Sequence, residues 1–72
     1  MEISARNVIA GKVAALKLGA VAAEIQVDIG GGTIVTSVIT VASAERLGLS
    51  VGKDVSVIVK ASDVMIGAAD GN

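Results

Sequence analysis

Residues 21–40 have the sequence VAAEIQVDIGGGTIVTSVIT, and this stretch decides the fold class. Its first nine residues alternate between an apolar face and a polar face that contains Glu24, Gln26 and Asp28. A period of two is typical of a β-strand with one buried side. Three glycines at residues 30–32 interrupt the pattern, and the following residues resume it with many β-branched side chains. The stretch therefore predicts a β-hairpin in an all-β domain.

The segments on either side of the hairpin predict one more strand and a helix. Residues 6–18 favour a long strand, in which Gly11 marks a bend or a bulge so that the strand can serve both sides of a barrel. Residues 41–47 favour a short helix, with Thr40 at its N-cap position and Gly48 at its end.

The C-terminal part of the chain predicts two further strands. Alternating valines mark a fourth strand at residues 55–59, and residues 63–67 predict a fifth. Five strands with one short helix between the third and the fourth are typical of an OB-like barrel. We expect a single domain over residues 1–72, with its core at about residues 3–67 and a flexible tail at residues 68–72.

Size and composition indicate an oligomer. A chain of 72 residues buries a limited share of its surface when it folds alone. It has no Cys and no His, which excludes disulfides and removes the usual zinc ligands, so we expect no metal ion bound directly by side chains. Since 53% of the residues are apolar and none is aromatic, the aliphatic surplus predicts an interface, and we expect a homo-oligomer.

Several classes of function are excluded by what the sequence lacks. Without His or Cys the usual general bases and thiol nucleophiles are missing, so we expect no enzyme and no catalytic residue. A net charge of −1 and the absence of aromatic residues oppose binding to nucleic acid. No apolar run approaches the roughly 18 residues of a membrane span, and the N-terminus lacks the pattern of a signal peptide. We therefore expect a cytoplasmic protein without a membrane partner.

Two features that could suggest chemistry have simpler explanations. Glu24 and Asp28 lie on the polar face of one strand, where acidic side chains are ordinarily solvated. The glycines at residues 30–32 resemble a phosphate-binding loop only in composition, because they join two strands and no Lys-Ser or Lys-Thr pair follows them. A flexible hairpin turn is the better interpretation.

Two polar clusters near the chain ends are more informative. Ser4-Ala5-Arg6-Asn7 combines a hydroxyl, a guanidinium and an amide, and Lys60-Ala61-Ser62-Asp63 follows a strongly apolar strand. Each could be no more than a solvated strand end or turn with local hydrogen bonds. Together, however, they offer the cations, hydroxyls and N–H groups that a dianion needs. Asp63 is the exception and should point away from such a ligand.

Four segments resemble the molybdate-binding Mop family, in order and spacing. They are SARN at residues 4–7 followed by Gly11, TSVIT at 36–40, LGL at 47–49 with Gly52, and KASDVMI at 60–66. The resemblance extends over roughly residues 3–67 and implies a single Mop domain. It further implies an OB-like barrel, a hexamer built as a trimer of dimers, and oxyanion sites between subunits.

The resemblance also implies which residues contact the oxyanion, because each contact of the family can be carried over to the matching position of this sequence. For the first site they are Ser4, Arg6, Thr40, Lys60, Ala61 and Ser62, with the backbone N–H groups of Ala5 and Arg6. A second site is placed around Gly19, Ala20 and Val21. Thr40 is also the candidate helix cap, so two roles compete for one hydroxyl.

The ligand chemistry agrees with this inventory. Molybdate is a tetrahedral dianion whose oxygens only accept hydrogen bonds, so a site made of donors can satisfy it without proton transfer. Tungstate has nearly the same size and charge as molybdate and should bind as well. The role of the protein would then be molybdenum storage or homeostasis. The alternative is an OB-fold assembly module with no specific anion. Composition alone favours that alternative.

Overall fold

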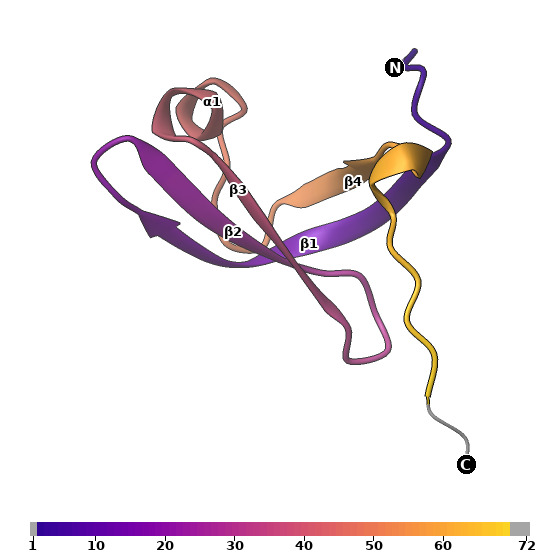
Figure 1. Ribbon diagram of the computed structural model, residues 1–72. Coiled ribbons are helices and arrows are strands. Elements are labelled where there is room, and N and C mark those ends of the chain that lie inside the picture. The colour runs from indigo at the N-terminus through magenta and orange to yellow at the C-terminus, as the bar shows by residue number, and fades with distance from the viewer. Residues whose placement is uncertain (1, 70–72) are drawn as a thin grey trace.

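The structure, a computed structural model, describes residues 2–69. Its elements in chain order are β1 (Asn7–Leu18), β2 (Ala22–Asp28), β3 (Ile34–Thr40), α1 (Val41–Arg46), β4 (Asp54–Val59) and the short 3₁₀ helix η1 (Ala61–Asp63). The strands form one antiparallel sheet in the order β3-β2-β1-β4 (Figure 1). The predicted all-β, OB-like architecture with one short helix between the third and fourth strands is confirmed.

The hairpin of β2 and β3 forms where the alternation predicted it. Gly30, Gly31 and Gly32 all have positive φ angles, of 98°, 62° and 80°, which glycine adopts without steric cost. The Asp28 carboxylate accepts a hydrogen bond of 2.8 Å from the Gly30 N–H and so helps to close the turn. A turn role for the glycines is therefore confirmed.

The long strand β1 pairs with two different strands along its length. Asn7–Lys12 pair with β4, whereas Lys12–Leu18 pair with β2. The sequence placed a bend or bulge at Gly11, but the register shift lies between Val13 and Ala15. There the N–H of Val13 donates to Lys53 and its carbonyl accepts from Gly52, so the turn before β4 holds the backbone at this point.

Gly11 is needed for close packing. A Cβ atom at this position would lie 2.6 Å from a methyl carbon of Val27 and 2.8 Å from the carbonyl oxygen of Asp28. Both distances are shorter than real Cβ contacts, and a backbone oxygen cannot move aside as a flexible side chain can.

The helix α1 is capped at both ends. The Thr40 hydroxyl accepts a hydrogen bond of 3.0 Å from the Ser43 N–H, as expected of an N-cap. At the other end Gly48 has a φ of 63°, and the Lys53 ammonium donates to the carbonyl oxygens of Leu47 and Gly48 at 2.6 and 3.2 Å. The predicted helix, its cap and its glycine stop are confirmed.

The predicted fifth strand at residues 63–67 is not formed within one chain. Asp63 ends η1, and the chain from Val64 to Ala69 has no regular secondary structure. A strand needs a neighbour for its backbone groups, and this segment pairs with no other part of residues 2–69. The four strands form a curled, open sheet, with β3 and β4 as its edges. Of the predicted tail, residues 70–72 lie outside the described residues.

The core of the single chain is small and aliphatic. Five residues are buried, namely Val13, Ala23, Ile25, Val27 and Ala44. Thirteen large apolar side chains among the described residues remain exposed, and Met65 and Ile66 retain 92% and 89% of their accessible surface. So much exposed apolar surface supports the expectation of an oligomer.

We expect the substitution Gly11→Ala to lower the free energy of unfolding by about 1–3 kcal/mol, the usual cost of overpacking. The physical reason is the clash with Val27 and the Asp28 carbonyl. Gly67→Ala is the matched control, because a Cβ there meets nothing within 4 Å. Thermal unfolding of both variants at one protein concentration tests this, and equal midpoints would contradict it.

Candidate functional site

The two polar clusters lie at the same end of the β1–β4 ladder. Asn7 pairs with Val59, and the Asn7 amide donates a hydrogen bond of 3.2 Å to the Val59 carbonyl oxygen. Arg6 precedes that pair on one strand and Lys60 follows it on the other. Because the strands are antiparallel, both cations leave the ladder at this end. Figure 1 likewise places the N-terminal segment beside η1.

The residues of these clusters are open to solvent. Ser4, Arg6, Lys60 and Ser62 are exposed, as is Ala61, and Ala5 is half-buried. Within residues 2–69 neither Arg6 nor Lys60 forms an ion pair, since the one salt bridge there joins Lys12 to Asp54 at 2.6 Å. Two unneutralised cations and two hydroxyls therefore gather at one end of the sheet, which favours a small anion.

The turn η1 limits which donors are available. The N–H groups of Asp63 and Val64 donate to the carbonyls of Lys60 and Ala61, at 2.9 and 3.3 Å. These two groups close the turn and are not free for a ligand. Within residues 2–69 the backbone N–H groups of Ala61 and Ser62 donate no such bond, so this turn can offer them together with the side chains of Lys60 and Ser62.

Thr40 does not join this cluster within one chain. It pairs with Ala22 at the start of β2, next to the end of β1 at Leu18. Asn7 and Leu18 are opposite ends of a 12-residue strand. A straight strand at about 3.3 Å per residue would separate them by roughly 36 Å. Arg6 and Thr40 of the same chain therefore cannot contact one tetrahedral anion.

The hydroxyl of Thr40 is already engaged at the helix. Besides accepting from the Ser43 N–H, it donates to the Ser43 hydroxyl at 2.9 Å. Sequence analysis did not single out Ser43, although an N-cap hydroxyl at Thr40 accepts from the N–H of the second or third helical residue, and Ser43 is the third. The capping role is thus the one realised here, and the anion contact stays a prediction.

Thr40 instead lies close to the proposed second site. Gly19, Ala20 and Val21 form the exposed turn between β1 and β2. The Gly19 N–H donates to the Ala22 carbonyl at 2.8 Å, and the Val41 N–H, next to Thr40, donates to the Val21 carbonyl at 2.8 Å. Gly19, Ala20 and Val21 offer an anion no charged or hydroxyl group, so the placement of a site there stays a prediction.

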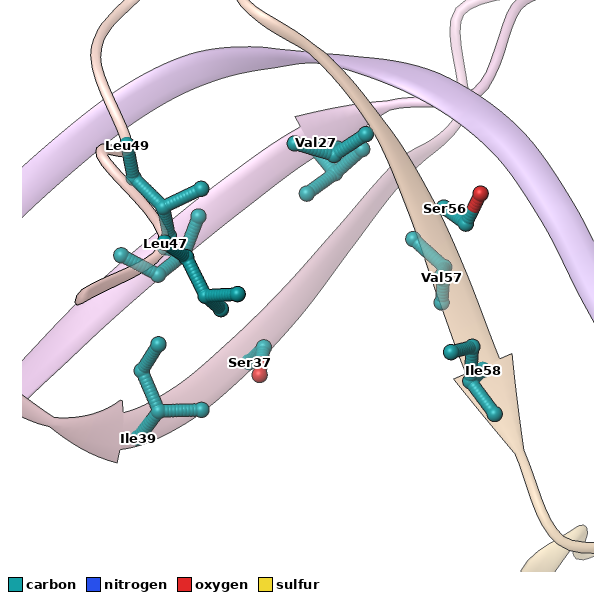
Figure 2. A pocket seen from close by; sticks show the side chains of 10 residues that line it. Val27, Ser37, Ile39, Leu47, Leu49, Ser56, Val57 and Ile58 are labelled. Carbon is teal, nitrogen blue, oxygen red and sulfur yellow. The ribbon is translucent and has the colours of Figure 1, made fainter. Parts of the chain in front are cut away.

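Further features of residues 2–69 concern metal ligands, membrane spans and an apolar groove. Residues 2–69 contain no group of three or more His, Cys, Asp or Glu side chains that could hold a metal. No helix in this part of the chain is long and apolar enough to cross a membrane. A groove of about 200 Å³ opens between β3 and β4 (Figure 2). Its lining is aliphatic except for Ser37 and Ser56, and it lacks a cation that could attract a dianion.

Comparison with known proteins settles the family. A sequence model of the TOBE domain matches residues 3–66. The chain belongs to the TOBE-domain family. The molybdenum-pterin-binding protein 2 of Clostridium pasteurianum is 48% identical to it over 66 residues, which are 92% of this chain and 97% of that protein. A relative named in this way, aligned over nearly its whole length, confirms the resemblance to Mop proteins and a single Mop domain.

Solved structures of similar proteins share the fold. A molybdate-binding protein from Sporomusa ovata superposes with a TM-score of 0.88 at 34% identity, over 94% of this chain and all of that one. ModG, described as a cytoplasmic molybdate-binding protein and solved with molybdate bound, gives a TM-score of 0.80 at 52% identity. That match covers 85% of this chain and 43% of the ModG chain. The relatives' names describe binding and not catalysis.

We expect Thr40→Ala to destabilise the protein by about 1 kcal/mol, the typical cost of losing an N-cap hydroxyl. Thr40→Ser keeps the hydroxyl that accepts from the Ser43 N–H and should restore most of the loss. Denaturant unfolding without molybdate measures the cap alone. If the two variants were equally destabilised, the hydroxyl would not be the stabilising group.

Proposed function

We propose that this protein binds molybdate, and tungstate as its analogue, at interfaces between subunits of a homo-oligomer. The observation that supports the proposal is the juxtaposition of Arg6 and Lys60, both without a counter-ion within residues 2–69, beside the hydroxyls of Ser4 and Ser62. The names of the relatives point to the same ligand. No reaction is proposed, because the ligand is held and released unchanged.

The chemistry of this donor set favours molybdate over phosphate. Guanidinium, ammonium and hydroxyl groups can all donate hydrogen bonds to a fully deprotonated tetrahedral dianion. Phosphate near neutral pH still has a proton, for which a site of donors offers few acceptors. Asp63 is the nearest carboxylate along the chain, and it would have to point away. Sulfate has no proton, so its exclusion would depend on the size of the cavity.

The separation of Thr40 from Arg6 supports a site shared between chains. If both residues contact one anion, they must come from different subunits, because β1 holds them apart within one chain. The exposed apolar side chains support the same conclusion independently. We therefore propose a hexamer, arranged as a trimer of dimers, in which one single-domain chain spans residues 1–72.

We further propose that the protein acts in the cytoplasm, in molybdenum storage or homeostasis. A binding protein without catalysis changes the free concentration of its ligand, which is what a store or buffer does. Bound anion at a subunit interface would also stabilise the assembly by mass action.

A second candidate function is an assembly module without a specific anion. The thirteen exposed large apolar side chains favour it, because they explain oligomerisation with no ligand. Equilibrium dialysis distinguishes the two candidates. The proposed function requires that molybdate binds while a short oligonucleotide does not, whereas the assembly module binds neither.

Arg6→Ala should weaken molybdate binding by about 10- to 150-fold, since a charge-assisted hydrogen bond contributes about 1.5–3 kcal/mol. Lys60→Ala should also lose affinity. Arg6→Lys should recover only part of the loss, because an ammonium cannot reproduce the planar fork of a guanidinium. Isothermal titration calorimetry measures all three variants.

Lys12→Ala is the matched control for these titrations. It also removes one positive charge, but Lys12 lies within β1 and is paired with Asp54, away from the cluster. Its affinity should stay close to that of the wild-type protein. If Arg6→Ala and Lys60→Ala bind as tightly as this control, the anion site lies elsewhere.

Anion selectivity should be visible in thermal unfolding. Ligand at ~100 times its dissociation constant stabilises the folded state by about 2.7 kcal/mol per site. Molybdate and tungstate should therefore raise the unfolding midpoint, sulfate much less, and phosphate hardly at all. Equal shifts with all four anions at matched ionic strength would indicate general charge screening and not a shaped site.

A further inference from the structure

One carboxylate lies within the polar cluster that is otherwise made of donors. Asp63 ends η1 directly after Ser62, and its N–H donates to the carbonyl of Lys60 at 2.9 Å. Its side chain is exposed, and the one salt bridge within residues 2–69 does not involve it. In this part of the chain, Asp63 therefore forms an ion pair with neither Lys60 nor Arg6.

The backbone of η1 keeps this carboxylate beside the donors. The N–H groups of Asp63 and Val64 close the turn through hydrogen bonds of 2.9 and 3.3 Å, and Figure 1 shows the N-terminal segment beside it. Asp63 follows Ser62 directly, so their Cα atoms are about 3.8 Å apart. Even if the carboxylate points away, its charge lies on the order of 10 Å from an anion that Ser62 contacts.

We propose that Asp63 limits the affinity of the anion site for molybdate by electrostatic repulsion. This role deepens the proposed function and rests on it. Carboxylate oxygens and molybdate oxygens only accept hydrogen bonds, so the two groups cannot bond to each other and their interaction is repulsive. A single charge about 10 Å from a dianion in water weakens binding about 2- to 4-fold at low salt.

A weakened site suits a protein that stores an anion, because a store must also release it. Arg6, Lys60 and the hydroxyls of Ser4 and Ser62 supply the attraction, and a carboxylate in the same turn as Ser62 offsets part of it. Asp63 therefore sets the affinity without contacting the ligand.

Two substitutions at Asp63 test this role by calorimetric titration with molybdate. Asp63→Asn keeps the size of the side chain and the N–H that closes η1, and it should raise the affinity about 2- to 4-fold at low salt. Asp63→Lys changes the charge by two and should raise the affinity by about the square of that factor, about 4- to 16-fold. A gain that grows with the change in charge distinguishes repulsion from a structural effect.

Salt provides a second readout. The titrations are made at about 0.01 M ionic strength, where the Debye length is about 30 Å, and at about 1 M, where it is about 3 Å. Charges on the order of 10 Å apart are screened at the higher concentration, so the ratio of the affinity of Asp63→Asn to that of the wild-type protein should fall close to one.

Asp28→Asn is the matched control. It removes the same charge and keeps an oxygen that can accept from the Gly30 N–H, but Asp28 pairs with Lys12 in β1, away from the cluster. Its affinity for molybdate should equal that of the wild-type protein. Thermal unfolding without molybdate verifies that all three variants are folded.

An affinity of Asp63→Asn equal to or below that of the wild-type protein would overturn the role of Asp63. So would a gain that is the same at both salt concentrations, or the same in Asp28→Asn. The proposed function fails separately, if Arg6→Ala and Lys60→Ala bind as tightly as the wild-type protein. Weaker binding by those two variants, with no gain in Asp63→Asn, rejects the role of Asp63 alone.

Discussion

The structure depends on one strand, β1, being shared between two ladders. Its first half pairs with β4 and its second half with β2, and Lys12 belongs to both pairings. The change of partner requires the sheet to curl tightly, which brings the backbone of Gly11 against Val27 and Asp28 with no room for a Cβ atom. The turn at Gly52 and Lys53 then holds Val13 through both of its backbone groups.

This sharing also determines where the candidate site residues lie. Because β1 and β4 are antiparallel and end together at Asn7 and Val59, the polar residues before one and after the other meet. The same length of β1 keeps Thr40 and the turn at Gly19 at the far end. One strand thus leaves six of the seven predicted first-site residues at one end of the sheet, and Thr40 with the three predicted second-site residues at the other.

Sequence analysis succeeded where local signals decide the structure. The alternation in residues 21–40 determines the hairpin because each strand buries one face, and the cap at Thr40 with the stop at Gly48 bounds the helix. Of the bend or bulge predicted at Gly11, a bulge was misplaced, because the register shift lies between Val13 and Ala15. Val13 also bonds to the turn at Gly52 and Lys53, a long-range contact that no local pattern shows.

The unpaired segment at residues 64–67 and the separation of Thr40 from Arg6 share a single cause. Strand propensity predicts that a segment can form a strand, and a motif predicts that a residue can contact a ligand. Neither predicts whether the neighbouring strand or residue belongs to the same chain or to another. Val-Met-Ile has the composition of a strand, yet within residues 2–69 it pairs with no other strand. The family resemblance assigns Arg6 and Thr40 to one site, yet β1 separates them within one chain. Only five aliphatic residues are buried within residues 2–69, so the proposed oligomer would cover apolar surface that the single chain leaves exposed. Fold and ligand binding would then respond to protein concentration together.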